Sequence, residues 1–445
     1  MVEVDFTKDA GPVKPMHGVG QPPMVGALGD WPMMHYLKEA GIPYSRLHDV
    51  GGWLGGGLYV DIPNLFPDFR ADENDPANYR FAYTDSLLKV LDGNGVEPFF
   101  RLGVTIENFV ERGYPPVNIM PPEDFGKWAR VCEHVVRHYT EGWADGFRMK
   151  ISHWEIWNEP DGNPDANANP MWRGTFAEYI RLYGTTATHL KNCFPHLMIG
   201  GYGGCGFYAG QEDGRTKFAT PWPRLEYFVT CARDFLTTVR DNGWPLDFFS
   251  FHSYSGADDI MRQVSFADAL LDEYGFPKCR CGRILDEWLP DAWTEACGSD
   301  RQAADIAATL IALQRGPCDI ACIYDARCGV GAYSPLFNPL TQQPHKAYYA
   351  LKCFNELFRL KREVKSVSGD PGLYVLAAGG PDGGAVFVAN ATDTSRPFAP
   401  DLGGMEIASC RITDATRTDD DAPTPAELPP HSFALLTVHR AASRQ

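Results

Sequence analysis

Short apolar runs with the composition of β-strands recur along the chain up to residue 325, and helix-length segments separate them. The runs lie at 14–20, 42–48, 96–103, 151–158, 197–204, 246–254, 282–288 and 319–325. Between them, apolar residues often recur at three- and four-residue steps, as over 121–141, which is typical of helices lying on a sheet. Strands alternating with helices predict an α/β protein with a parallel sheet.

Eight such strand-and-helix pairs predict a closed (β/α)8 TIM barrel over residues 8–365. A doubly wound open sheet is the structural alternative. The pattern changes at about residue 366, where short alternating runs separated by Gly, Pro and Asp predict a smaller C-terminal antiparallel β-sandwich over 366–445. The strand-like opening, residues 2–7, is expected to join this sandwich.

Length, charge and cysteine usage narrow the class of protein. A chain of 445 residues exceeds the size of one ordinary core, which agrees with two domains. A formal net charge of −17 argues against nucleic acid and membrane partners, since both need a cationic face. The N-terminus shows no secretory signal, and the 12 scattered cysteines are typical of reduced core residues, so a cytoplasmic location is expected unless a signal has been removed. No cofactor and no metal are expected.

Two acidic residues stand where a barrel carries its chemistry, at the carboxyl ends of the strands. Glu159 follows the fourth run and Glu287 ends the seventh. Strands four and seven face each other across an eight-stranded barrel, so the two carboxyls are expected to meet over its mouth. Burial and mutual repulsion keep one such carboxyl protonated and the other charged, which retaining glycoside hydrolysis requires.

The motifs around these acids resemble a known family. WNEP at 157–160, FHSY at 251–254 and DEW at 286–288 look like the retaining glycosidases of clan A, and the wider pattern is most similar to glycoside hydrolase family 39. YSRLHD at 44–49 and HKAYYALKCFNEL at 345–357 support the resemblance, which spans residues 1 to about 365. A pair of such motifs about 130 residues apart is a stronger signal than either alone.

The resemblance implies a role for each residue of these motifs. Glu159 would be the general acid and base, and Glu287 the nucleophile. Asn158 would hydrogen-bond the sugar 2-hydroxyl, Tyr254 would donate to Glu287, and His252 would support the acid. Further substrate contacts are expected at His48, Trp288 and Tyr324, with structural support from Arg46 and Glu155.

Strand alternation adds two expectations about buried acids. Glu155 shares parity with Glu159, so it should point into the barrel and pair with Arg46. Asp286 has the opposite parity to Glu287 and should point away from the barrel axis. The blander alternatives are that Glu159 is a helix-start acid, and that Glu287 is a salt-bridge partner of Arg46 or Arg283.

The sugar is the open part of the prediction. The family resemblance indicates an exo-acting enzyme on β-xylosides or related pentosides, including arabinose-containing ones, so an oligosaccharide or glycoside is the expected partner. Tyr324 stands where clan A often has tryptophan, and Arg101 ends the third run, so a uronic-acid glycosidase is an alternative. A non-catalytic carbohydrate-binding protein is another. A metal-dependent hydrolase is disfavoured because His48 and His252 lack a third ligand. Whether the chain forms a homo-oligomer stays open.

Two loops were given structural interpretations. The glycine-rich segment 51–57 lacks the Lys and Ser/Thr of a phosphate loop, and a substrate-facing loop is expected there. The acidic segment 68–76 lacks the alternating ligand spacing of a calcium loop, so a solvated turn is expected.

Overall fold

The computed structural model describes residues 2–24, 32–50, 59–105, 117–208, 222–290, 296–329, 331 and 333–440. Eight parallel strands close into a barrel in chain order, from β2 to β9. They are β2 (Gly18–Gly20), β3 (Tyr44–Leu47), β4 (Glu97–Leu102), β5 (His153–Ile156), β6 (Met198–Gly204), β7 (Phe248–Ser253), β8 (Gly282–Trp288) and β9 (Ile320–Ile323). The TIM barrel prediction is confirmed, and each strand lies within one of the eight predicted runs.

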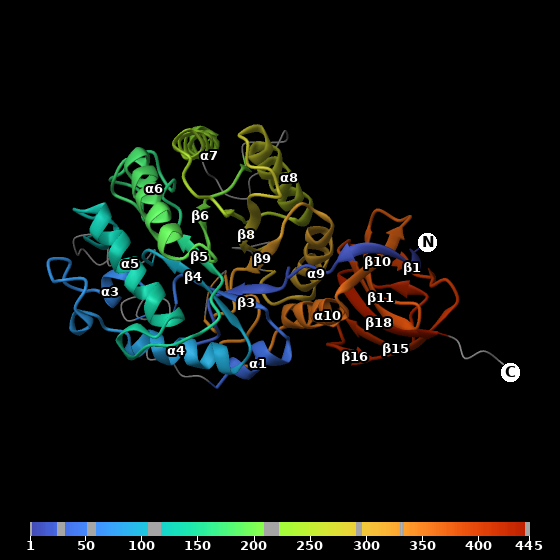
Figure 1. Cartoon of the computed structure of the whole chain (residues 1–445). Coiled ribbons are helices and arrows are strands. Elements are labelled where there is room, and N and C mark those ends of the chain that lie inside the picture. The colour runs from blue at the N-terminus through green and yellow to red at the C-terminus, as the bar shows by residue number, and fades with distance from the viewer. Residues whose placement is uncertain are drawn as a thin grey trace.

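Helices surround the barrel (Figure 1). They are α1 (Met34–Glu39), α3 (Ile62–Leu65), α4 (Ala82–Gly93), α5 (Phe125–Thr140), α6 (Phe176–Cys193), α7 (Trp222–Asn242), α8 (Ala257–Glu273), α9 (Asp300–Arg315) and α10 (Lys346–Leu360), with 3-10 turns η1 (Pro76–Asn78), η3 (Val117–Ile119) and η4 (Trp143–Asp145). Local chemistry sets their starts. The Asp124 carboxylate accepts from the Lys127 amide at the start of α5, and Thr175 with Glu178 forms a capping box on α6.

A second, mostly antiparallel sheet lies beside α9 and α10, at the end of the molecule that holds both termini (Figure 1). Its order is β14-β1-β10-β11-β12-β18-β15-β16, and a two-stranded sheet, β13-β17, accompanies it. Its strands are β1 (Val2–Pro12), β10 (Arg362–Ser368), β11 (Leu373–Gly380), β12 (Gly383–Asn390), β14 (Pro400–Asp401), β15 (Met405–Thr413), β16 (Asp420–Asp421) and β18 (Ser432–Arg440), and the small sheet has β13 (Arg396–Pro397) and β17 (Glu427–Leu428). β1 pairs antiparallel with β10, so it lies in the same sheet as the last described strand, β18.

The predicted division between residues 365 and 366 falls inside β10 and stays a proposal. Phe398 and Leu428, at the small sheet, share one buried cluster with Val4 and Val386 of the large sheet, separate from the barrel core. The two sheets therefore enclose an apolar interior between them.

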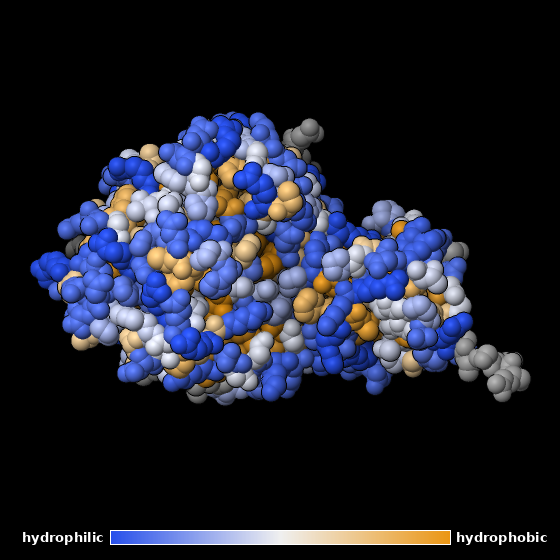
Figure 2. All heavy atoms as spheres, viewed as in Figure 1, coloured by the Kyte–Doolittle hydropathy of each residue, from blue (hydrophilic) through white to orange (hydrophobic). Residues whose placement is uncertain are grey.

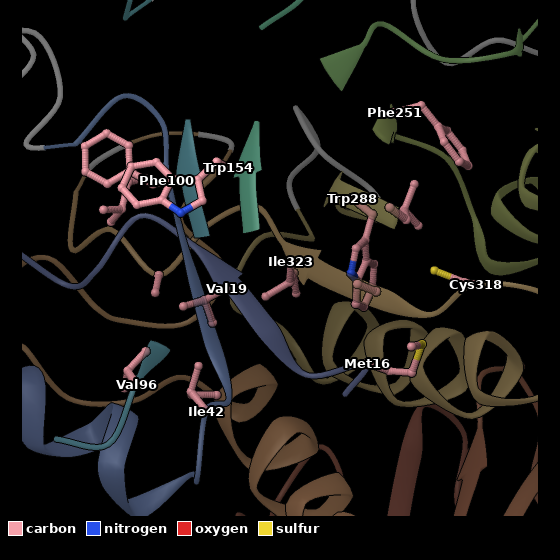
Figure 3. Packing of buried hydrophobic residues seen from close by; sticks show 14 of the residues in the cluster. Met16, Val19, Ile42, Val96, Phe100, Trp154, Phe251, Trp288, Cys318 and Ile323 are labelled. Atoms are coloured by element: carbon pink, nitrogen blue, oxygen red, sulfur yellow. The ribbon is translucent and has the colours of Figure 1, made fainter. Parts of the chain in front are cut away.

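The barrel has a large core of its own between its strands and helices. Figure 3 shows Phe100, Trp154, Trp288 and Ile323 among its buried side chains. The outer face in Figure 2 is mostly hydrophilic, and the large exposed hydrophobic residues of the described chain are scattered, as Tyr83, Met120 and Leu340 illustrate. None of the helices in the described ranges is long and apolar enough to cross a membrane.

Candidate active site

The predicted site residues gather at the carboxyl ends of the barrel strands, and most come within contact of one another. Their positions in the fold are Arg46 on β3 and His48 just after it, Glu155 on β5 with Asn158 and Glu159 following, His252 on β7 with Tyr254 following, Glu287 on β8, and Tyr324 directly after β9. Residues far apart in the chain are thus neighbours because parallel strands end at one rim of the barrel.

Glu159 and Glu287 are brought together around His252. A carboxylate oxygen of each glutamate and a ring nitrogen of His252 all lie within 4.8 Å of one another. His252 Nδ1 is 2.7 Å from Glu159 Oε1 and 3.4 Å from Glu287 Oε2. This separation is close to the value of about 5 Å typical of a retaining glycosidase and shorter than an inverting enzyme needs for its water.

The two carboxyls have different surroundings. Glu287 accepts from the Tyr254 hydroxyl at 2.5 Å on one oxygen and from Arg46 Nη1 at 2.7 Å on the other. Only 5% of its side chain is exposed, whereas 19% of the Glu159 side chain is. Two strong donors stabilise the charged form of Glu287. Glu159, by contrast, has a neutral ring as its close neighbour.

Burial dominates the proton affinity of each group. It raises the pKa of Glu159 to about 7. Burial also raises the pKa of Glu287, although His252, Arg46 and the Tyr254 hydrogen bond oppose that shift. Burial lowers the pKa of His252 to about 4, so the ring is neutral near pH 7. A proton on Glu159 can therefore be donated to His252 Nδ1 in the short hydrogen bond between them.

Arg46 donates hydrogen bonds to three side chains of the site. Its Nε donates to Glu155 at 2.8 Å, Nη1 to Glu287 at 2.7 Å, and Nη2 to the Asn158 side-chain oxygen at 2.7 Å. Glu155 also accepts from the Ser250 hydroxyl at 2.6 Å. The Asn158 Nδ2 is buried and has no hydrogen-bond partner within the described part of the chain.

The backbone after β5 is shaped to present Asn158 and Glu159. Trp157 and Glu159 both have positive φ, 74° and 43°, which is strained for residues with a side chain. The Glu159 amide donates to the Gly203 carbonyl at 2.9 Å. Gly203 itself has φ of 61°, and a Cβ there would lie 3.2 Å from Arg46 Nη2, so glycine leaves room for the guanidinium.

Asp286 overturns the expectation from strand alternation. It is fully buried, and its Oδ2 lies 2.7 Å from Arg46 Nε, so it points toward the barrel axis rather than away. The ladder between β7 and β8 shifts between the pairs Phe251↔Leu285 and His252↔Glu287. One extra residue on β8 interrupts the alternation there, and both acids can face inward.

Trp288 is also placed differently from the prediction. It has no exposed surface and lies in the barrel core, where Figure 3 draws it among residues such as Ile323. As the neighbour of the inward-pointing Glu287, it faces the opposite side of β8. The prediction that Trp288 contacts the sugar directly is therefore wrong.

Tyr324 and His48 belong to a polar group that sequence reasoning recognised only in part. The Tyr324 hydroxyl donates to Asp49 at 3.0 Å and accepts from Gln21 at 3.0 Å. His48 Nε2 lies 3.3 Å from Asp49 and 4.0 Å from Glu287. Asp49 and Gln21 were missed, although each directly follows a predicted strand or its flanking histidine. Asp161, whose pKa burial raises to about 7, was missed as well.

Among the residues that the structure describes, two clusters have ligand types that suit a metal ion. One is the Glu159, His252 and Glu287 group, and the other is Glu133, His189 and Cys193 on α5 and α6. In the second, the Glu133 carboxylate is already paired with His189 at 2.6 Å and with Arg137 at 2.7 Å. In the first, the Arg46 guanidinium holds Glu287, and its positive charge opposes a cation.

Two loops, 68–76 and 51–57, were also interpreted from the sequence. In the acidic segment 68–76, Asp68 bonds Arg70, Asp72 bonds Asn74, and Asp75 caps η1, so the segment bonds within itself as a turn. Glu73 is the exception and pairs with Arg130 of α5. The glycine-rich segment 51–57 lies outside the described residues.

The sequence of this chain is similar to those of known proteins. The family model for glycosyl hydrolases family 39 matches residues 3–275. A β-xylosidase of Caldicellulosiruptor saccharolyticus is 27% identical over 223 residues, which cover 48% of this chain and 37% of the relative. The chain spans less than half the length of the curated relatives it matches.

Solved structures agree in fold over the whole chain. A glucosidase from Croceicoccus marinus superposes with a TM-score of 0.75 at 20% identity, and covers 99% of both chains. A monomeric β-xylosidase from Caulobacter crescentus gives 0.69 at 17% identity, again over 99% of both chains. At these identities the likeness establishes the barrel and its accompanying sheet, and no more.

Proposed function

The chain belongs to glycosyl hydrolases family 39, and from this premise we propose that it is a retaining exo-glycosidase that hydrolyses its substrate by double displacement. Glu159 is the general acid and base, and Glu287 is the nucleophile. The observation that carries the proposal is the pair of carboxyls, within 4.8 Å of each other, with donors directed at Glu287 and a raised pKa at Glu159.

In the first step, the Glu287 carboxylate attacks the anomeric carbon while Glu159 gives its proton to the leaving oxygen. The Tyr254 hydroxyl and the Arg46 guanidinium hold Glu287 charged and oriented. In the second step, Glu159 takes a proton from water, which attacks the anomeric carbon and releases Glu287. The same carboxyl serves both steps because it loses its proton in the first.

Asn158 supports the transition state rather than the proton transfer. Arg46 donates to its side-chain oxygen, and its buried Nδ2 has no partner among the described residues, so this nitrogen is the donor proposed for the substrate. A donor to the sugar 2-hydroxyl strengthens as positive charge develops on the ring. His252 supports Glu159 through Nδ1, and His48 and Tyr324 contribute polar contacts next to the nucleophile.

The proposed substrates are β-xylosides or related pentosides, including arabinose-containing ones. The curated relatives bear the name β-xylosidase. A uronic-acid substrate would need a cation to meet its carboxylate. Arg101 is fully buried against Asp61 at 2.7 Å, and Arg46 already contacts three carboxyls, so neither offers its charge to a ligand.

A panel of aryl glycosides tests this function. We expect hydrolysis of aryl β-xyloside to exceed that of aryl α-arabinoside, β-glucoside and β-glucuronide, with an unchanged rate in excess chelator. Turnover of the glucuronide alone would favour the uronic-acid alternative. Binding of sugars without any turnover would favour a carbohydrate-binding protein, and loss of activity with chelator would indicate a metal-dependent enzyme.

The pH profile should report Glu159 on its alkaline side. Glu159 must be protonated to assist departure, and its pKa is about 7. The value of kcat/KM should therefore fall tenfold per unit as pH rises beyond about 7, because the free enzyme loses its acid. The profile is measured as initial rates on a glycoside with a poorly activated leaving alcohol, because an acidic phenol departs without a proton. A profile on that substrate that stays flat to pH 9 would contradict this assignment.

Replacing Tyr254 with phenylalanine should affect Glu287. A lost hydrogen bond to a charged group lowers kcat/KM by roughly 10- to 100-fold. Because the Tyr254 hydroxyl lowers the pKa of Glu287, its removal should move the acid limb of the pH profile to higher pH. Tyr179→Phe is a matched control, since it removes a buried hydroxyl that donates to the Ile156 carbonyl. An acid limb that moves equally in both variants would refute a specific effect.

A further inference from the structure

Asp286 is a buried acid of the site to which the proposed reaction gives no role. It comes from β8, immediately before Glu287, and is turned inward by the register shift beside it. Its side chain has no exposed surface. Oδ2 lies 2.7 Å from Arg46 Nε, and Oδ1 lies 3.7 Å from His252 Nε2. The residue thus lies against Arg46 and has no surface open to solvent.

The hydrogen-bond geometry leaves Asp286 without a donor. Arg46 Nε carries a single hydrogen, and it donates to Glu155 Oε2 at 2.8 Å. Although Asp286 Oδ2 is close to the same nitrogen, neither of its oxygens accepts a well-aligned hydrogen bond from the described residues. A buried carboxylate with no aligned donor is costly, whereas a neutral carboxylic acid brings a donor of its own.

The neighbour that can accept this hydrogen is Glu155, because its Oε2 and Asp286 Oδ2 lie 2.8 Å and 2.7 Å from the same nitrogen, Arg46 Nε. Two carboxylates this close to one N–H repel each other when both are charged, so a proton on one of them is favoured. Glu155 also accepts from Arg46 and from the Ser250 hydroxyl, so it is the better-stabilised anion of the two. The proton therefore belongs on Asp286.

The charges around Asp286 also favour a proton on this residue. Facing it are Arg46 from β3, Glu155 from β5, His252 from β7, Glu287 from β8, and the buried Cys322 thiol from β9. Of these only Arg46 is a cation near pH 7, because burial lowers the pKa of His252 to about 4. One guanidinium cannot offset the three buried carboxylates of Glu155, Asp286 and Glu287. Burial and the neighbouring Glu155 raise the pKa of Asp286 well above its usual range, while Arg46 opposes that shift.

We propose that Asp286 is a positioning residue: a neutral carboxylic acid that donates a hydrogen bond to Glu155 and so leaves the charge of Arg46 to Glu155 and Glu287. The inference rests on the proposed function of Glu287 as nucleophile. Without the donor on Asp286, Glu155 would draw the guanidinium toward itself, and Glu287 would lose its cation. Asp286 acts on the reaction through Arg46 and touches no reacting atom.

The protonation state can be measured without any turnover. An infrared difference spectrum of wild type minus Asp286→Asn at neutral pH should contain a carboxylic-acid C=O band that shifts in D2O. Asn keeps the shape of the side chain and removes only the titratable group. Absence of that band would overturn the proposal, whether or not the enzyme is active on xylosides.

The effect on Glu287 is read from kinetics of two variants. Asp286→Ala should lower kcat at least about tenfold with KM changed less than about threefold, because the loss is of orientation and not of binding. Asp286→Asn, which still donates to Glu155, should recover at least about a third of the wild-type kcat. A wild-type kcat in the Ala variant would show that Asp286 only fills space.

The pH profile of Asp286→Asn tests separately whether Asp286 is neutral or ionised. If Asp286 is neutral, the acid limb that reports Glu287 stays within about 0.3 unit of wild type, since no charge has been removed. If Asp286 were ionised, its removal would take away a like charge beside Glu287 and lower that limb by about one unit. A downward shift of that size would overturn the proposal, and an inactive wild type would instead refute the proposed function.

Discussion

Replacing Glu287 with glycine is expected to lower kcat by about 10⁴-fold or more on every glycoside that the wild type hydrolyses, because no covalent intermediate can form without the nucleophile. The variant also opens a space beside the anomeric carbon. Azide or formate should enter it and restore turnover, and azide should yield a glycosyl azide of inverted configuration. The measurement is the initial rate with rising anion concentration, together with the configuration of the product.

Glu287→Gln is the matched variant for this test. It removes the charge but keeps the volume of the side chain, so it should be equally slow and should not respond to azide. An unchanged rate in Glu287→Gly would reassign the nucleophile. A slow Gly variant that no small anion rescues would mean that Glu287 serves structure alone, as the partner of Arg46 at 2.7 Å.

Replacing Glu159 with alanine is expected to have an effect that depends on the leaving group. For glycosides with poorly activated alcohols, kcat/KM should fall by about 10³-fold or more, since general acid catalysis contributes about 10² to 10⁴. Aryl glycosides with acidic phenols need no proton and should lose little in their first step. Their covalent intermediate should then accumulate, because the base for the second step is missing, and azide should accelerate its breakdown.

The measurement is a plot of log kcat/KM against the pKa of the leaving phenol. It should be nearly flat for wild type and steep for Glu159→Ala. Glu133→Ala is the control, since it removes a glutamate that also hydrogen-bonds a histidine, His189 at 2.6 Å, but on the outer helices. The same slope in wild type and Glu159→Ala would exclude Glu159 as the acid.

The barrel could be predicted because its physical causes are local. Each strand is a short apolar run ended by turn residues, and each intervening helix repeats its apolar face at three- and four-residue steps. Helix starts also depend on residues close together in the sequence. Ser299, for example, caps α9 by accepting a hydrogen bond from the Gln302 amide. The pairing of β1 with β10 joins residues more than 350 positions apart, as Val2 and Ser368 show. Only composition and the position of the chain ends indicated it.

The closeness of Glu159 and Glu287 could be predicted because barrel topology brings the ends of distant strands together. Asp286 could not be located correctly by the same reasoning. Strict alternation assigns it to the outer face of β8, and a single register shift, which leaves no mark in the residue pattern, turns it inward. Its contacts with Arg46 and Glu155 depend on that shift.

The hydrogen bonds around Tyr324 are a second feature that the sequence could not predict. Tyr324 was singled out as a strand-end aromatic that could stack on a sugar. In the structure its hydroxyl lies between Asp49 and Gln21, so its hydrogen bonds are made to the ends of two other strands. Which polar side chain reaches which neighbour depends on packing across three strands, and that information is absent from any one segment.

The central claim is most directly tested by trapping the glycosyl-enzyme with a 2-deoxy-2-fluoro xyloside that has an activated leaving group. Mass spectrometry of the intact protein should show one added fluoro-sugar, and the labelled peptide should carry it on Glu287, with Asp286 unmodified. Time-dependent inactivation should reverse when an acceptor alcohol is added. A label on Glu159 or any other residue, or an enzyme that turns over its substrate with inverted anomeric configuration and acquires no label, would contradict the account.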